Sequence, residues 1–286
     1  MTNTPKAADS VSDYYSALTS SLPILSVMNE ISLGLYGPDT KSEQEAIIRS
    51  NSTLVQGCKL GPESHVLDSG SGHGSTSVWL AQTFGCQVTG ITNCEPQVPV
   101  ARDIADQAGV SDLVNFCQGD FMNLPFPDSS FDLVINQESF CYATDKDDYL
   151  RGVYRVLKPG GKWQAMETLL TGVPLTNEQQ QIHESMQQNC VIPPMVSVDS
   201  VLASLKHAGF TDIRDRSYDS EAMVHTDIIQ RRWAVWQLFF MPKSDDSETS
   251  RAGRGLIGSA CDFGKGLEQG VFTYSFVTGT KPNSSS

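Results

Sequence analysis

The chain of 286 residues is 39% hydrophobic and 19% charged, which is typical of a globular protein with one large domain or one domain plus a cap. Its 33 acidic and 20 basic residues give a formal net charge of -13. Such a surface repels polyphosphate backbones and anionic lipids, so neither a nucleic acid nor an anionic membrane surface is an expected partner.

The seven cysteines contain no C-x-x-C pair, which is the pattern of neither a zinc site nor a disulfide framework. No apolar run approaches the roughly 20 residues of a membrane span. The first residues lack the basic start and apolar core of a signal peptide. We therefore expect a cytoplasmic protein with no integral membrane segment.

The chain begins with a polar stretch over residues 1–10, which we expect to be a disordered tail. The segment "VSDYYSALTSSLPILSVMNEISLGLYG" follows and carries apolar residues at roughly helical spacing. We expect residues 11–58 to form an N-terminal helical lid.

Short apolar runs alternate with helical segments from Val66 onward. The predicted strands cover residues 65–70, 87–92, 114–120, 131–137 and 162–168, and the predicted helices cover 75–85, 96–109 and 146–161. Strands that alternate with helices at this spacing indicate a parallel sheet covered on both faces, with right-handed crossovers. We expect this core over residues 59–170.

Residues 171–262 are expected to form a C-terminal helical cap. Helices are predicted over 178–189, 197–210 and 227–241, and a loop is predicted over 241–255. Residues 263–286 are expected to hold the final strand and a polar tail, with an edge-strand alternation over 270–280. Helical additions on both sides of the core suggest a cap over the carboxyl edge of the sheet, where such sheets bind ligands.

The stretch "VLDSGSGHGSTSVWLA" joins the first predicted strand of the sheet to a helix through Asp68, Gly70, Gly72 and Gly74. Glycines at such a junction let the backbone approach a ligand and present its N–H groups. The spacing differs from the dinucleotide pattern G-x-G-x-x-G and from the phosphate loop. Dinucleotides, phosphates and S-adenosylmethionine (SAM) all remain candidates for this loop, as does a structural turn in which Asp68 caps the helix.

Three later strand ends, "QVTGITNCEPQ", "CQGDFMNLPF" and "VINQESFCYATD", converge on this loop. Together they resemble class I SAM-dependent methyltransferases over roughly residues 60–165, and "RVLKPGGKW" resembles their helix-to-strand turn. The resemblance implies an α/β fold with a Rossmann-like, doubly wound, mostly parallel sheet of about seven strands, between the N-terminal lid and the C-terminal cap. It also implies that the three glycines pass under the methionine part of SAM, that Asp68 orients it, and that Asp120 with Phe121 holds the adenine.

Most such enzymes end the second strand with an acidic residue on the ribose, but this chain has Thr92 there. The departure resembles the branch of sterol, tocopherol and geranyl diphosphate C-methyltransferases and cyclopropane synthases, and it implies that Gln97 contacts the ribose. Gln97 in the first turn of a surface helix is the alternative. The predicted cofactor contacts are Asp68, Gly70, Gly72, Gly74, Thr92, Asn93, Gln97, Asp120, Phe121 and Gln137.

The stretch "NQESFCY" places Glu138 where that branch has an "ES" pair, beside the SAM methyl group. Methyl transfer to an alkene carbon leaves a carbocation, which requires a nearby anion, aromatic faces and a base. The predicted catalytic residues are Glu138, Tyr142, Tyr15 and Tyr36. Tyr36 belongs to "LGLYG", which resembles the lid of the same group. The alternatives are a solvated carboxylate and tyrosines that only pack.

Further candidate walls and bases are Tyr14, Trp233, Trp236, His183 and His225. Helical tryptophans three residues apart more often belong to a core, and a lone helical histidine is more often structural.

Three functions remain open from the sequence. The first is C-methylation of an isoprenoid, which requires magnesium only if the substrate is a diphosphate; Arg231, Arg232, Arg251 and Arg254 are the basic residues that suit one. The second is N- or O-methylation of a small amine, amino acid or phenol. The third is a SAM-fold cyclase without methyl transfer, because a fold fixes the cofactor site and not the reaction. The expected partner is a small-molecule substrate, and a homodimer through the helical cap is a further candidate.

Overall fold

The structure is a computed structural model that describes residues 10–19, 32–228 and 248–283. The predicted tail lies almost wholly outside these residues, as do most of the helix predicted over 227–241 and the first part of the loop predicted after it. Four candidate residues also fall outside the described part: Arg231, Arg232, Trp233 and Trp236.

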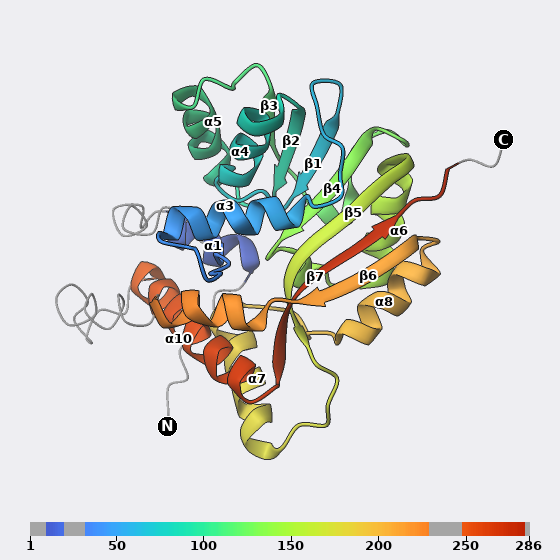
Figure 1. Cartoon of the computed structure of the whole chain (residues 1–286). Helices are drawn as coiled ribbons and strands as arrows, with labels where there is room; N and C mark the ends of the chain where they lie inside the picture. Colours follow the sequence, from blue (N-terminus) through green and yellow to red (C-terminus); the bar gives the residue numbers. More distant parts are fainter. Residues whose placement is uncertain (1–9, 20–31, 229–247, 284–286) are drawn as a thin grey trace.

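A seven-stranded sheet forms the centre of the described structure (Figure 1). Its strands are β1 (His65–Ser69), β2 (Gln87–Thr92), β3 (Val114–Gln118), β4 (Phe131–Gln137), β5 (Leu157–Leu170), β6 (Thr211–Ser217) and β7 (Phe272–Thr280). They lie in the order β3-β2-β1-β4-β5-β7-β6, and the pairs from β3 to β5 are parallel while β7 is antiparallel to both of its neighbours. The predicted doubly wound, mostly parallel sheet is confirmed.

Helices cover both faces of this sheet. One face packs against α3 (Glu43–Leu54), α4 (Ser75–Phe84) and α5 (Gln97–Gln107), and the other packs against α6 (Lys146–Val156) and α8 (Val198–His207). Each face of the sheet has its own apolar cluster. Val66 of β1 belongs to the cluster on the side of α3, α4 and α5, and its neighbour Leu67 belongs to the cluster on the side of α6 and α8. The central strands β1, β2 and β4 are therefore buried along nearly their whole length, as expected where helices cover both faces of a parallel sheet.

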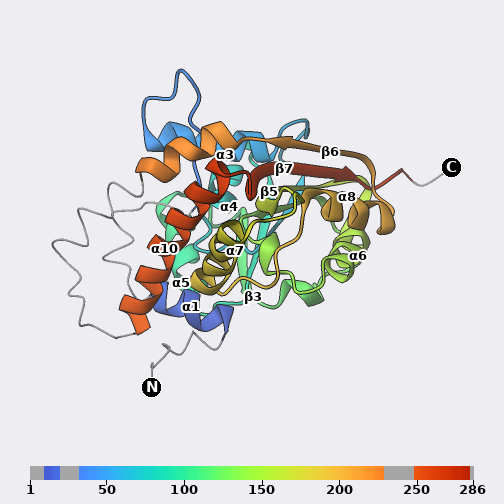
Figure 2. The same cartoon turned by 90° about the horizontal axis from the view of Figure 1, so that it is seen from below.

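Three helices from the two ends of the chain lie together beside the sheet. These are α1 (Val11–Thr19), α7 (Asn177–Cys190) and α10 (Glu248–Glu268), and Figure 2 shows them as neighbours. A small apolar cluster of Tyr14, Leu18, Cys190 and Ala252 holds them to one another. The N-terminal and C-terminal additions thus form one cover, while the proposed boundaries between lid, core and cap stay a prediction.

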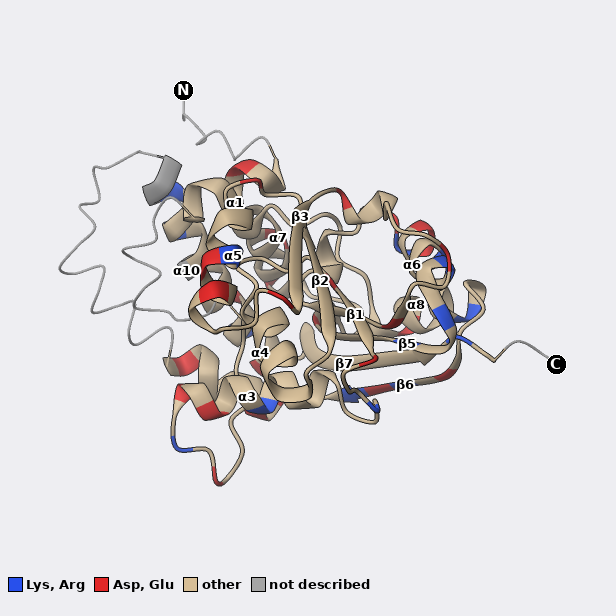
Figure 3. Ribbon diagram, turned by 90° about the horizontal axis from the view of Figure 1, so that it is seen from above, with Lys and Arg blue, Asp and Glu red and all other residues tan. Residues whose placement is uncertain are grey.

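Two strands of the C-terminal half differ from the sequence prediction. The stretch 270–280, predicted as an edge strand, contains β7, which lies between β5 and β6 and is largely buried. The edge strand is β6, in a region predicted to hold only helices. Its sequence "TDIRDRS" places charges of both signs on exposed positions (Figure 3). No apolar alternation marks such a strand, and charges are typical of sheet edges.

The helix α10 begins at Glu248, where the sequence predicts a loop through residue 255. Its glycines are the reason for the error. A Cβ at Gly255 would lie 2.4 Å from the carbonyl oxygen of Asn189 on α7. Gly255 therefore permits close packing of α10 on α7 and does not mark a turn.

Candidate active site

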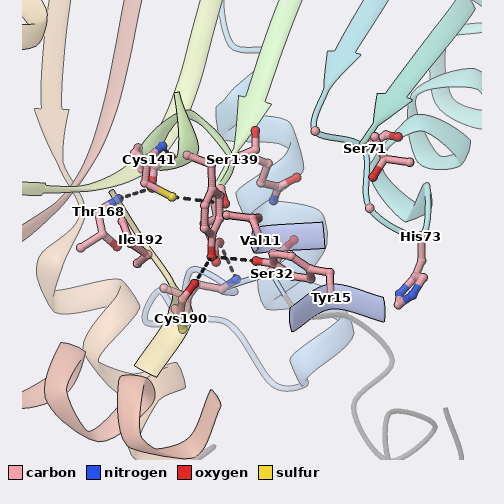
Figure 4. Close-up of a pocket in the computed structure, with 18 of the residues that line it drawn as sticks. Val11, Tyr15, Ser32, Ser71, His73, Ser139, Cys141, Thr168, Cys190 and Ile192 are labelled. Atoms are coloured by element: carbon pink, nitrogen blue, oxygen red, sulfur yellow. Dashed lines mark hydrogen bonds between the residues drawn. The ribbon is translucent and has the colours of Figure 1, made fainter. Parts of the chain in front are cut away.

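A cavity of about 260 Å³ lies at the carboxyl ends of the parallel strands, under α1, α7 and α10. In Figure 4, Ser71 and His73 of the glycine loop lie on one side of it, and Cys141 and Thr168 lie on the other. The cavity therefore has a side formed by the loop after β1 and a side formed by the ends of β4 and β5. We call them the loop side and the strand side.

The loop side has room for a ligand against bare backbone. Gly72 has φ +52°, and a Cβ built there would meet no other atom within 4 Å. The neighbouring Ser71 hydroxyl is buried and has no hydrogen-bond partner among the described residues. An open position over glycine and an unpaired buried hydroxyl fit a polar ligand that approaches the backbone closely.

Asp68, at the end of β1, is a buried carboxylate on this side. Its Oδ2 accepts a hydrogen bond of 2.6 Å from the Ser77 hydroxyl, and burial raises the pKa of Asp68 to about 6. The prediction that Asp68 orients SAM is consistent with this setting, because an ammonium group beside a desolvated carboxylate offsets the cost of its burial.

Thr92 and Gln97 lie together after β2. The Thr92 hydroxyl donates to Gln97 Oε1 at 2.7 Å and accepts from the Cys94 amide at 3.2 Å. The carbonyl of the Gln97 side chain is thereby engaged, and its NH2 group is the part that remains to donate to a ligand. Asn93 also lines the cavity, and its carbonyl accepts from Ser12 of α1 at 3.3 Å.

Twelve of the fourteen predicted site residues line the cavity, and Asp120 and Tyr36 do not. The exposed Asp120 accepts from the Met122 amide at 2.8 Å and caps the short helix η1 (Phe121–Asn123), while Phe121 reaches the lining. The contact of Asp120 and Phe121 with the adenine stays a prediction. Gln137 lines the cavity, but its amide already bonds to Thr76 at 2.6 Å and Asn51 at 3.1 Å.

Tyr36 and the two candidate histidines lie outside the cavity lining. The ring of Tyr36 is 5.7 Å from that of His225, and the Nδ1 atom of the buried His225 accepts from the Gly34 amide. His183 lies beside Phe272, with ring centroids 6.3 Å apart. Both ring nitrogens of His183 are buried without a hydrogen-bond partner among the described residues, and a role for these residues as bases at the cavity is not supported by their position.

Glu138, directly after β4, is held in place by hydrogen bonds of its backbone and its side chain. Its amide donates to the Met166 carbonyl at 2.9 Å, and its Oε1 accepts from the Leu33 amide at 2.7 Å and the Tyr274 hydroxyl at 2.8 Å. Its φ of +53° is uncommon for a residue other than glycine. Strained backbone that is held by several contacts is concentrated at functional sites.

Tyr15 of α1 and Tyr142 of the short helix η2 (Phe140–Tyr142) form an aromatic corner of the cavity. Their rings are 5.8 Å apart at 79°, their hydroxyls are 3.1 Å apart, and Tyr142 donates to the Cys190 carbonyl at 3.1 Å. Burial raises the pKa of both phenols, so both stay protonated.

Sequence reasoning missed several lining residues. Glu167 belongs to the stretch "KWQAMET", in which an acidic residue near the end of a buried strand was an available signal. Leu256, Ser259, Ala260 and Phe263 lie on α10, just after the loop predicted over 241–255, and Phe263 falls in the segment predicted to hold the final strand. The other missed lining residues include His73, Met186, Cys190, Ile192 and Met195.

Within residues 10–19, 32–228 and 248–283, no three His, Cys, Asp or Glu side chains are grouped as a metal site. No helix of the same residues has the length and apolarity that crossing a membrane requires.

The glycine loop, the polar residues after β2 and the reversed strand β7 together define the class I SAM-dependent methyltransferase arrangement. A family model described as "Methyltransferase domain" matches residues 67–163. O-methyltransferase resE of Aspergillus sclerotiorum is 31% identical over 223 residues, which are 75% of this chain and 82% of that protein. The chain therefore belongs to the SAM-dependent methyltransferase family.

Sterol 24-C-methyltransferase ERG6B of Gibberella zeae is 36% identical over 172 residues, 59% of this chain and 45% of that protein. The chain thus spans about half the length of such curated relatives. Among solved structures, the [4+2]-cyclase SpnF superposes with a TM-score of 0.80 and 26% identity, over 98% of each chain. These likenesses support the predicted sterol-type branch of the family.

Proposed function

We propose that the protein uses SAM to methylate a carbon–carbon double bond of an apolar, isoprenoid-type small molecule. The observation that carries the proposal is the position of Glu138. This carboxylate lies at the end of β4, on the cavity wall, with two donors on one oxygen and the Tyr15–Tyr142 corner on the same cavity.

The loop side would hold the cofactor. Asp68 would accept from its amino group, the backbone at Gly72 would lie against its methionine part, and Gln97 would donate to a ribose hydroxyl. Phe121 would pack against the adenine. SAM supplies an electrophilic methyl group on a positively charged sulfur that already serves as leaving group.

The strand side would hold the acceptor. Its wall combines Glu138 with the tyrosine corner and with apolar residues that include Met186, Ile192 and Phe263. An anion and aromatic rings stabilise positive charge that develops on a carbon skeleton, most strongly where water is excluded. The helices α1, α7 and α10 provide this exclusion because they cover the carboxyl ends of the strands.

We infer that the acceptor is neutral. Three carboxylates, Asp68, Glu138 and Glu167, line the cavity, and their field repels an anionic substrate such as a prenyl diphosphate. The sterol-type relatives agree with a neutral isoprenoid. Magnesium would then have no role, since it is tied to a diphosphate substrate.

A second candidate function is cyclisation of a bound polyene without methyl transfer. It is favoured by the full-length likeness to the [4+2]-cyclase SpnF. An aromatic, acidic cavity suits a polarised cyclisation as well as a methylation, because both place positive charge on carbon.

Mass spectrometry of products tests both candidates. The purified protein is incubated with methyl-deuterated SAM and a pool of sterols, prenylated phenols, prenyl diphosphates, amines and polyenes, each with and without magnesium. Label on a carbon of a neutral isoprenoid supports the proposal, whereas label on a hydroxyl oxygen or an amine replaces it with the corresponding methyltransferase. An unlabelled isomer of a polyene supports the cyclase. The matched controls are Glu138→Gln and Glu184→Gln, since both remove one charge and only Glu138 lines the cavity.

A cytoplasmic location and a homodimer through the helical cover also stay predictions. Light scattering of the purified chain tests the second.

A further inference from the structure

Glu167 is a second carboxylate on the strand side of the cavity, near the end of β5. The amide of Glu138 donates to the carbonyl of Met166, the residue directly before Glu167, at 2.9 Å. The two glutamates therefore occupy neighbouring strand ends and line the same cavity.

The carboxylate of Glu167 is held in one orientation by backbone groups. Its Oε2 accepts from the Cys141 amide at 2.9 Å and its Oε1 accepts from the Thr168 amide at 3.0 Å. The Cys141 thiol is a third hydrogen-bond partner, and two carboxylate oxygens together offer about four acceptor sites, so the carboxylate keeps capacity for one more donor. Only 2% of the residue is exposed, so that donor comes from the cavity and not from bulk water.

The titratable groups around Glu167 come from four elements. Lys146 of α6 attracts it, but its ammonium donates to the carbonyls of Cys141 and Ala143. The Cys141 thiol of η2, the Tyr274 phenol of β7 and Glu138 are the other titratable groups, and burial raises the pKa of both the thiol and the phenol. Burial likewise raises the pKa of Glu167 to about 7, although its two backbone donors and Lys146 oppose the shift.

We propose that Glu167 accepts the proton that the substrate loses after methyl transfer, while Glu138 remains the fixed anion. The inference rests on the proposed alkene methylation. A C–H bond next to the cationic carbon breaks, its electron pair becomes the new double bond, and its proton converts the Glu167 carboxylate to a carboxylic acid. The acid returns the proton to solvent when the product leaves.

The environments of the two glutamates assign these roles. Glu138 Oε1 receives a phenol and a backbone amide, which stabilise the charged form. Burial raises the pKa of Glu167 to about 7, and a base whose pKa lies near the working pH transfers protons most effectively. Two carboxylates in unlike environments that take separate roles are a recurrent arrangement in enzymes.

Glu167→Gln tests the assignment through pH dependence and product structure. In the wild type, kcat/KM should rise as the pH passes through about 7, because the base must be ionised. The variant should lose this limb and at least about 100-fold of turnover, on the scale of general base catalysis. Its residual product should shift to a methylated alcohol, from capture of the cation by water, or to a double-bond isomer. The infrared band of a protonated carboxyl that titrates near pH 7 should also disappear.

Two controls separate this role from a structural one. Calorimetry with S-adenosylhomocysteine shows whether Glu167→Gln retains the cofactor site, and Glu167→Asp keeps a carboxylate if the amide disturbs the fold. The Asp variant should retain both the pH limb and the wild-type product at lower turnover. If Glu167→Gln binds S-adenosylhomocysteine, forms the wild-type products and keeps the pH limb, Glu167 is not the proton acceptor. If the wild type itself methylates no alkene, the proposed function fails first and this inference falls with it.

Discussion

Gly72→Ala tests where the cofactor lies, because the substitution adds a methyl group to an open part of the cavity. Gly72 has a φ of +52°, and no atom lies within 4 Å of the added Cβ. The loss of stability caused by the backbone conformation can therefore be separated from the loss of affinity caused by contact with the ligand. The backbone conformation costs about 1–2 kcal/mol of stability for a residue other than glycine, and no clash inside the protein adds to that cost. Any further loss must come from the ligand.

Gly109 provides the matched control. It has φ +70° after α5, and a Cβ there also meets no atom within 4 Å, but it does not line the cavity. Both alanine variants should therefore lose similar stability in urea unfolding. Only Gly72→Ala should lose affinity for S-adenosylhomocysteine, by tenfold or more, which corresponds to about 1.4 kcal/mol.

Isothermal calorimetry measures both affinities directly. Equal affinities of wild type, Gly72→Ala and Gly109→Ala would refute the placement of the cofactor against this loop. A large stability loss confined to Gly72→Ala would show instead that the added methyl group meets protein atoms and that the loop is packed differently.

The remaining predictions concern three polar groups of the cavity. Glu138→Gln should lower turnover by about 100-fold or more while leaving the affinity for S-adenosylhomocysteine unchanged; turnover within a few-fold of wild type would remove Glu138 from the mechanism. Affinity for SAM should rise with pH as Asp68 ionises through about 6, and it should fall again when the ligand's own amino group deprotonates near pH 8; Asp68→Asn should abolish the lower limb in calorimetric titrations. Tyr142→Phe should cost about 1–3 kcal/mol of stability because it leaves the Cys190 carbonyl and the Tyr15 hydroxyl unpaired. Tyr15→Phe keeps the bond from Tyr142 to Cys190 and should cost at most about 1 kcal/mol. Equal losses in urea unfolding would contradict the order of these hydrogen bonds, from Tyr15 to Tyr142 to Cys190.

The parallel half of the sheet was predictable because its strands are buried on both faces and because glycines mark the ends of the helices between them. The antiparallel half was not. The edge strand β6 exposes its charges and shows no apolar alternation, while β7 alternates in sequence yet is buried between two strands. Gly255 presented the same signal as a loop glycine, since close helix packing and chain reversal both favour a residue without a side chain.

The candidate site divides in the same way. Asp68 and Thr92 lie at the ends of β1 and β2, and Gly72, Gln97 and Glu138 come within five residues after strands. A strand pattern alone therefore locates all five at one edge of the sheet. The pairing of Thr92 with Gln97, five residues apart, follows from the turn after β2. Residues of α7 and α10 reach the cavity only through tertiary packing, which no local pattern records.

This division explains how the chain's relatives can resemble it and still differ in their named reactions. The family match over residues 67–163 contains the loop side, Glu138 and Tyr142. Glu167, Tyr15 and the contributions of α7 and α10 lie outside it, and they are most of what an acceptor would touch. The strand side can therefore vary without changes in the loop that is predicted to hold the methyl donor, and an O-methyltransferase, sterol C-methyltransferases and a cyclase can share the scaffold. For this chain the reaction must be argued from the wall, where Glu138, with two donors on one oxygen, and the buried Glu167 line the cavity with the tyrosine corner. The proposed chemistry, which creates and then discharges a cation, rests on these groups.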